Sequence, residues 1–306
     1  MGNPLTDKAF VKLLDDDLTK VFTNRYKALP LKRDMLFTVN KSSKAWNEYY
    51  GVGSVPDPVE FAGTVEYQSV SPGYTTKIEP IEFAGGITVQ RRLLDTDRYG
   101  VVKNMASGLG AAAHRYMDKI AHQPFIYHDS AAFSFMTSEE GVALCSNSHT
   151  TKSGTSTSTG FDNLSTLSLT AANLETLRIQ SRGLKDDISE RIDTNFDTII
   201  HGTNQSAIVW EIMNSVGKHD SVNNDANFHK GRWKSIELPL LDDYDTNDWF
   251  IVDSAKMKES LIWQEGVPLE FNATKDFDTM MRKYISYFVC GWGFTDWRWI
   301  IGSSVS

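Results

Sequence analysis

One stretch, residues 61–123, constrains the fold of this chain most, because it joins two extended segments directly to a long helix. Residues 62–70 alternate between apolar and polar side chains, as a half-buried strand does. Ser71-Pro72-Gly73 has the composition of a turn, and an apolar pattern interrupted by Pro and Gly resumes over residues 74–89. We therefore predict a bent two-stranded arm over residues 61–93.

The predicted arm has few neighbours in the sequence that could bury its apolar side chains. Two strands alone are only marginally stable in water. The hairpin therefore either folds over the core of its own domain or packs against another copy of the chain, and the sequence leaves both alternatives open. A surface that one chain cannot bury favours a subunit of a larger assembly over a self-contained enzyme.

A long amphipathic helix is predicted over residues 97–123, where Pro124 would end it. Apolar residues recur there every three or four positions, namely Val102, Met105, Ala106, Leu109, Ala113, Tyr116, Met117 and Ile120. At ~1.5 Å per residue such a helix is roughly 40 Å long. The Gly-rich run of residues 108–113 resembles a dinucleotide fingerprint, but no buried strand precedes it, so no cofactor is expected.

The segments on either side of residues 61–123 differ from each other in composition. An amphipathic helix is predicted over residues 5–29, with Thr6 as its N-cap. The Ser/Thr/Gly run of residues 152–160 indicates a surface loop and a boundary.

A compact α/β module is predicted after this boundary. It comprises a helix over residues 171–182, a strand over 196–201, a helix over 205–216 and a strand over 247–253. Thr170 should cap the first helix, and Gly183 should follow it in the left-handed conformation. Further strands are predicted at 269–271 and 284–290, with the nearby Trp292, Trp297 and Trp299 in the core.

Composition limits the possible functions. The 306 residues are 41% hydrophobic and carry a net charge of −8, whereas a conventional nucleic-acid binder would show a basic stripe. An 18-residue apolar run is missing, and the N-terminus lacks the apolar core of a signal peptide, so neither a membrane span nor export is expected. The two cysteines, Cys145 and Cys290, are far apart, which favours a reducing cytoplasm over a disulfide scaffold.

Two constellations invite a chemical interpretation. Cys145 and His149 suggest a thiol nucleophile, but the sequence around them matches no catalytic signature, so a structural turn is favoured. Residues 243–248 resemble the start of a calcium loop, but Asp248 and Ser254 stand where that loop needs Gly and Glu. No catalytic, cofactor-binding or metal-binding residue is therefore predicted.

The order of these elements resembles a known family, and three stretches carry the resemblance. The first comprises Gly2-Asn3-Pro4, Leu13-Leu14 and Leu29-Pro30. The second is residues 141–149, GVALCSNSH, and the third combines residues 169–175, LTAANLE, with residues 245–250, DTNDWF. Together they resemble the tailed-phage major capsid protein of the Hong Kong 97-type fold, and in particular the Mu-like major head subunits.

The resemblance implies an α+β coat fold in five parts. These are an N-terminal arm (1–60), an extended hairpin loop (61–96), a spine helix with the peripheral domain (97–162), an axial domain (163–260) and returning strands (261–306). The arm begins almost at Met1, so either the scaffold is a separate protein or this chain is already mature. Lys77 lies in the loop, but no motif marks an Asn partner for the crosslink that some relatives form.

The implied function is a non-enzymatic one, self-assembly into the icosahedral head shell that encloses double-stranded DNA. Its partners would be further copies of itself in hexamers and pentamers, portal and scaffolding proteins, and packaged DNA bound non-specifically, with no membrane. Its place would be the virion, after synthesis in the host cytoplasm. Candidate inter-subunit contacts are Tyr67, Tyr74, Lys77, Arg91, Arg92, Phe10 and Leu14. The alternatives are an encapsulin-like compartment shell and a cytoplasmic thiol hydrolase.

Overall fold

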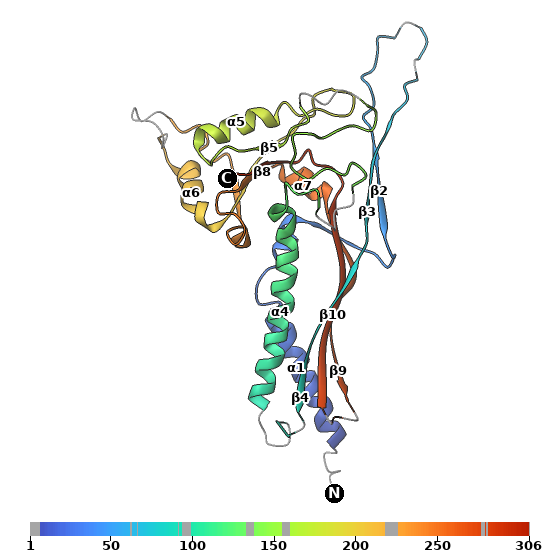
Figure 1. Cartoon of the computed structure of the whole chain (residues 1–306), viewed down its shortest axis with the longest axis vertical. Coiled ribbons are helices and arrows are strands. Elements are labelled where there is room, and N and C mark those ends of the chain that lie inside the picture. Colours follow the sequence, from blue (N-terminus) through green and yellow to red (C-terminus); the bar gives the residue numbers. More distant parts are fainter. Residues whose placement is uncertain are drawn as a thin grey trace.

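The computed structural model describes residues 7–61, 63–65, 67–90, 92–93, 99–132, 138–154, 160–217, 226–276, 279 and 281–305, with the backbone alone for 7–14. The molecule has three parts, which Figure 1 shows as a long limb below, a lobe to one side and a projecting loop above. Helices pack beside sheets whose strands are mostly antiparallel, so the fold is α+β.

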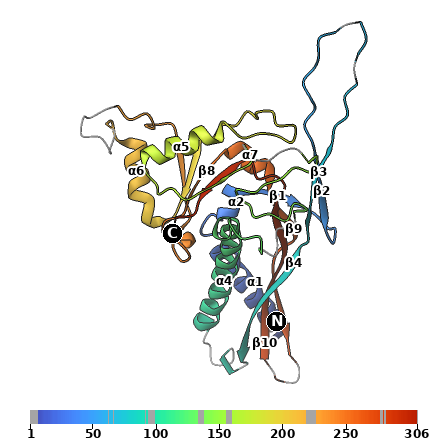
Figure 2. The same ribbon diagram turned by 45° about the horizontal axis from the view of Figure 1, so that its top comes forward.

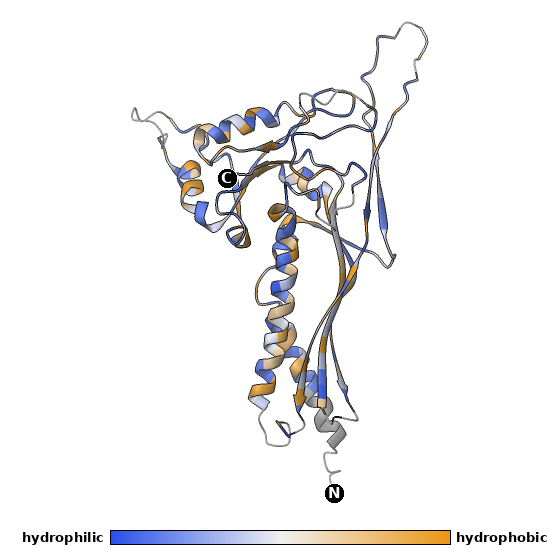
Figure 3. Ribbon diagram, viewed as in Figure 1, coloured by the Kyte–Doolittle hydropathy of each residue, from blue (hydrophilic) through white to orange (hydrophobic). Residues whose placement is uncertain are grey.

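The limb combines two helices with a four-stranded sheet. The helices are α1 (Asp7–Tyr26) and α4 (Tyr99–Ile126). The sheet has the order β1-β9-β10-β4, with bounds β1 (Thr38–Lys41), β4 (Ile81–Gln90), β9 (Leu261–Lys275) and β10 (Met281–Phe294). Apolar and polar residues alternate along α4, as Figure 3 shows, and Val102, Ala106, Leu109 and Ala113 pack against α1 and the sheet.

The small residues of α4 allow the two limb helices to approach closely. A Cβ added at Gly110 would lie 2.7 Å from the carbonyl oxygen of Phe22 in α1. Ala106 and Ala113 are buried nearby. The glycine-rich run thus allows close packing of the two helices at Gly110 and is not a dinucleotide-binding site.

The lobe is built on a five-stranded sheet of order β5-β11-β8-β6-β7. Its strands are β5 (Leu164–Ser165), β6 (Thr198–His201), β7 (Lys234–Glu237), β8 (Trp249–Val252) and β11 (Ile300–Ser303). The helices α5 (Ala171–Ser181) and α6 (Ser206–Asn214) lie in the same lobe, and the predicted module of two helices and two strands is confirmed.

Short elements lie between the longer ones and close to the core that the limb and the lobe share. They are α2 (Lys32–Leu36), η1 (Thr203–Gln205), η2 (Pro239–Leu241) and α7 (Ser254–Ser260). The predicted burial of the C-terminal tryptophans is confirmed, because Trp292, Trp297 and Trp299 all lie in this core.

The predicted pairing of the arm is wrong. Strand β3 (Pro72–Ile78) pairs with the upstream β2 (Asn47–Val52), and Pro72-Gly73 begin the strand where a turn was expected. The second predicted strand, residues 74–89, is divided between β3 and β4, and β4 pairs with β10 in the limb. The projecting loop therefore comprises residues 47–78, and Figure 2 shows it leaving the body in a second view.

Tertiary contacts explain this pairing. A Cβ on Gly51 would lie 2.6 Å from the carbonyl oxygen of Tyr74, so the two strands approach more closely than side chains would allow. Val89 on β4 is completely buried against the limb helices, which draws β4 away from β3.

Helix ends also differ from the sequence prediction. Helix α4 continues through Pro124 to Ile126, because the amide of Tyr127 still donates to the carbonyl of Gln123 and both Pro124 and Phe125 are buried. The Thr170 cap of α5 is confirmed, with its hydroxyl accepting from the Asn173 amide at 3.1 Å. Gly183 does not adopt the predicted left-handed conformation, and Arg182 ends the helix at φ −75°. The predicted cap Thr6 lies outside the described residues.

Candidate functional site

Exposed apolar side chains gather on the projecting loop. Between β2 and β3, the described part of residues 53–71 (the loop tip) forms no helix or strand. The exposed apolar residues of the loop are Tyr50, Val52, Val55, Val59, Phe61, Val65, Tyr67 and Val70, with Tyr67 95% exposed. The tip sequence contains Asp57, Glu60 and Glu66 but neither Lys nor Arg. The tip is therefore both apolar and acidic.

The loop is fixed at its base along β3. The Thr75 amide donates to Glu139 Oε2 at 3.0 Å, and the Glu139 amide donates to the Thr75 carbonyl at 2.8 Å. Tyr74 Oη and Thr150 Oγ1 lie 2.7 Å apart. Lys152 Nζ contacts both oxygens of Glu139 at 2.8 Å, and together with the Thr75 amide it lowers the pKa of that carboxyl. These contacts attach β3 to residues 138–152, which we call the clamp segment.

The other side of the loop base is held by Asp187. Its Oδ1 accepts from the Ser54 amide at 2.7 Å, and the Gly53 amide donates to the Ser71 carbonyl at 2.9 Å. A Cβ on Gly53 would overlap the Asp187 carboxylate, so only glycine fits there. The tip thus leaves the body from a base that is bonded on both sides.

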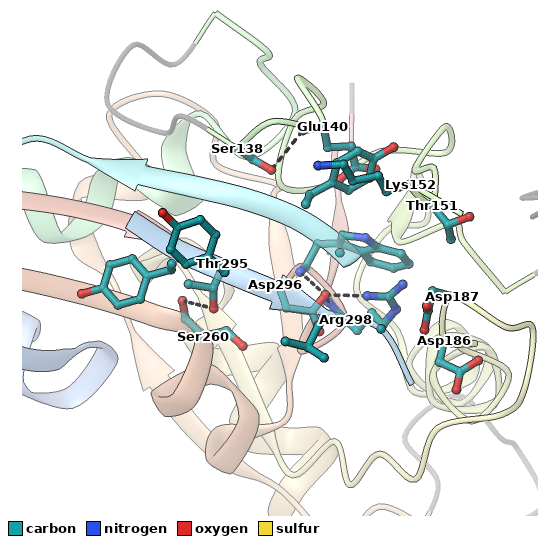
Figure 4. A pocket seen from close by; sticks show the side chains of 18 of the residues that line it. Ser138, Glu140, Thr151, Lys152, Asp186, Asp187, Ser260, Thr295, Asp296 and Arg298 are labelled. Atoms are coloured by element: carbon teal, nitrogen blue, oxygen red, sulfur yellow. Dashed lines mark hydrogen bonds and ion pairs between the residues drawn. The ribbon is translucent and has the colours of Figure 1, made fainter. Parts of the chain in front are cut away.

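A cleft of about 710 Å³ lies under the loop base. The loop base, the clamp segment and residues 186–187, 256–262 and 294–298 line it, as Figure 4 shows. Arg298 in this cleft is engaged with the protein, since it donates to Asp296 Oδ1 and to the Lys185 carbonyl, both at 2.8 Å. Across the described part of the chain, no group of three or more His, Cys, Asp and Glu could hold a metal ion.

A second hollow, of about 400 Å³, lies between α4 and the edge strand β4 (the limb groove). The ring of Phe83 lines it, with its centroid 5.2 Å from the ring centroids of both Tyr116 and Phe288. Arg115 and Lys119 are exposed on its helical side. The limb groove is apolar inside and cationic at its rim.

The structure separates the predicted contact residues. Tyr67 is at the tip, while Tyr74 and Lys77 are on β3 at the base, with Lys77 Nζ 4.8 Å from the Trp46 ring centroid and paired with Glu79. Arg92 is exposed at the end of the limb, and Arg91 lies outside the described residues. Phe10 and Leu14 fall in α1, where only the backbone is described. Their role in assembly stays a prediction.

Cys145 and His149 do not form a catalytic pair. Both ring nitrogens of His149 face other partners, Glu140 and Asn163. Cys145 is buried beside Gly302, and burial raises the pKa of its thiol, which suppresses the nucleophilic thiolate. Sequence analysis missed Glu139, Asp187 and Asn163, because single carboxylate and amide residues carry no local signal of a tertiary contact.

No helix in the described part of the chain is long and apolar enough to cross a membrane. No curated protein sequence matches this chain. Solved structures of similar fold include the procapsid of bacteriophage JBD30 (TM-score 0.52, 15% identity, 98% of this chain and 77% of that chain). They also include a virus-like particle from Pyrococcus furiosus (TM-score 0.52, 11% identity, 94% and 98%) and the cyanophage Pam1 capsid (TM-score 0.53, 9% identity, 91% and 91%).

The family described as "Phage capsid protein" matches residues 73–302, which include β3, the whole limb sheet apart from β1, helix α4 and the lobe. These are the elements from which the loop projects. The chain is thus a member of the phage capsid protein family, with the fold of tailed-phage major capsid proteins.

Proposed function

We propose that this chain is the major subunit of an icosahedral phage head that encloses double-stranded DNA. One observation carries the proposal: the loop tip exposes apolar side chains that its own body does not cover. Family membership places the chain in a capsid. Buried apolar area is the main driving force of stable association, so the tip is the element expected to join subunits.

We propose the limb groove of a neighbouring copy as the surface that receives the tip. The tip is apolar with three carboxylates and no cation, and the groove is apolar with Arg115 and Lys119 at its rim. Apolar surfaces would be removed from water while opposite charges meet, which sets the orientation of the contact. The groove and tip of one chain would then repeat around a closed ring of copies.

We also propose that the chain forms hexamers and pentamers, that it contacts portal and scaffolding proteins, and that it binds packaged DNA non-specifically. We further propose that it is made in the host cytoplasm, that it belongs to the Mu-like subgroup, and that it divides into the five parts given above. The pairing of β2 with β3 supports a loop over residues 47–78 in this division.

The decisive experiment removes the tip and keeps its base. Replacing residues 55–69 with Gly-Gly-Ser-Gly retains the Gly53–Ser71 and Ser54–Asp187 bonds. We expect a subunit with wild-type circular dichroism that forms no closed shells in negative-stain images, because the deleted segment contributes little to the subunit's own core. Its control keeps the tip length and replaces only Gln68 with Ser. Shells of wild-type size from the shortened chain would refute the proposal.

An encapsulin-like compartment shell is the second candidate, since the fold also matches the virus-like particle from Pyrococcus furiosus. The two candidates share the fold and differ in what the shell encloses. A thiol hydrolase finds no support in the geometry around Cys145.

A further inference from the structure

His149 belongs to the clamp segment and is completely buried. Its ring stacks on Trp297 with the centroids 4.0 Å apart and the planes 6° from parallel. Nδ1 lies 3.1 Å from Glu140 Oε1, and Nε2 lies 3.1 Å from Asn163 Oδ1. Glu140 is also buried, with 4% of its side chain exposed.

The orientation of the Asn163 amide is fixed by its other partners. Its Nδ2 donates to the carbonyls of Leu144 at 2.9 Å and Ile300 at 3.2 Å. Its Oδ1 accepts from the Ser146 amide at 2.7 Å. Since this oxygen can only accept, Nε2 of His149 must carry a proton.

The second ring nitrogen faces an acceptor as well. Glu140 Oε1 already accepts from the Thr150 amide at 2.7 Å. Beside an ionised Glu140, a neutral imidazole, which has only one N–H, would aim a nitrogen lone pair at one of these two oxygens inside the protein. A buried nitrogen lone pair that faces an acceptor oxygen costs free energy, whereas a buried charged pair that is fully hydrogen-bonded is tolerated.

We infer that His149 is held as an imidazolium paired with the Glu140 carboxylate, and that this buried pair fixes the direction of the projecting loop. The pair binds the clamp segment to Trp297 and Asn163 in the core. Each partner of the pair is the direct neighbour of a residue that bonds β3: Glu139 precedes Glu140, and Thr150 follows His149. Loss of the pair should therefore loosen the loop base.

The protonation state has a direct spectroscopic test. In full-length, unassembled subunits labelled with ¹⁵N-histidine and studied at pH 7 by NMR, we expect both ring nitrogens of His149 to be protonated. His229 is the internal reference for a neutral ring, because its Nε2 faces the Ala171 carbonyl and its Nδ1 accepts from Trp233 Nε1. A bare nitrogen on His149 would overturn the inference, including the case in which Glu140 holds the proton.

The positioning role is tested by amide hydrogen exchange in unassembled subunits. We expect His149→Phe, which keeps the ring stack but removes both hydrogen bonds, to speed exchange in residues 72–78 by at least about tenfold. The matched control is His229→Phe, a buried histidine beside a tryptophan in the lobe, which should leave residues 72–78 unchanged. If His149→Phe does not fold, Glu140→Gln is measured in its place.

Unchanged exchange in residues 72–78 of a folded variant would contradict the positioning role. The link from the loop base to shells rests on the proposed function, but the NMR and exchange readouts do not need assembly. If the tip deletion did not block shell formation, this inference would be unaffected. If the NMR or exchange result contradicted the inference, the proposed function would be unaffected.

Discussion

At the scale of single residues, burial decides the chemistry of both cysteines. Cys145 and Cys290 are 1% and 2% exposed. Burial raises the pKa of both thiols, that of Cys290 to about 12, because a thiolate would lose its hydration. Residues that a reader of the sequence would single out as reactive are therefore inert parts of the core.

This burial predicts how the thiols react. In the folded subunit at pH 8, a water-soluble thiol reagent should label neither cysteine, whereas in denaturant it should label both, as counted by intact mass. A free surface thiol such as an introduced Ser153→Cys provides the positive control. Fast labelling of native Cys145 would revive the nucleophile hypothesis.

The same pKa shifts give the stability a pH dependence of known sign. Between the ordinary thiol pKa of about 8.5 and the raised values in the folded state, only the unfolded chain loses its thiol protons. The cysteines therefore stabilise the fold fully below about pH 8.5 and lose that contribution as the pH rises through the folded-state pKa. The urea midpoint should fall steadily above pH 9, and Cys290→Ala should flatten the fall relative to wild type.

At the scale of elements, the tip and the limb groove are complementary in charge and apolarity. Reversing the rim with Arg115→Glu and Lys119→Glu should leave folding intact, since both side chains are exposed. We expect shell yield, measured by sedimentation, to fall at least about tenfold, because like charges would then face each other across the contact.

A charge swap sharpens this test. Adding Asp57→Lys and Glu60→Lys to the reversed rim should restore part of the shell yield. Lys230→Glu, an exposed cation on the lobe, is the control and should assemble normally. Equal yields from the rim variant and the Lys230 control would show that the tip docks elsewhere.

At the scale of the whole molecule, the projecting loop, the lobe and the limb extend in three different directions (Figure 1). Such a shape leaves several faces available to other copies, as a shell subunit requires. The net charge of −8 disfavours unspecific association with nucleic acid before assembly. Any contact with packaged DNA would then rest on enclosure in the shell.

The content of native particles separates the two shell candidates. Particles purified from the natural source should protect double-stranded DNA from added nuclease, and the DNA should become digestible once the shell is opened. Particles that instead hold a stoichiometric folded protein and no protected DNA would favour the compartment shell.

The sequence alone determined the local elements whose signals are local. The three-to-four spacing of apolar residues located α4, Thr170 located the start of α5, and short buried runs located β6 and β8. Burial of the three C-terminal tryptophans also followed from their size and setting. The order of these elements was enough to suggest the capsid fold.

Only the tertiary structure decided which strands pair and where the loop projects. Ser71-Pro72-Gly73 has turn composition, yet it runs into β3 because Gly51 and Gly73 let β2 approach, and β4 is drawn to β10 and α4. Glu139 and Asp187 hold the loop base through partners far away in the sequence. Strand partners and side-chain networks depend on free energy gained between distant segments, and no window of neighbouring residues contains that information.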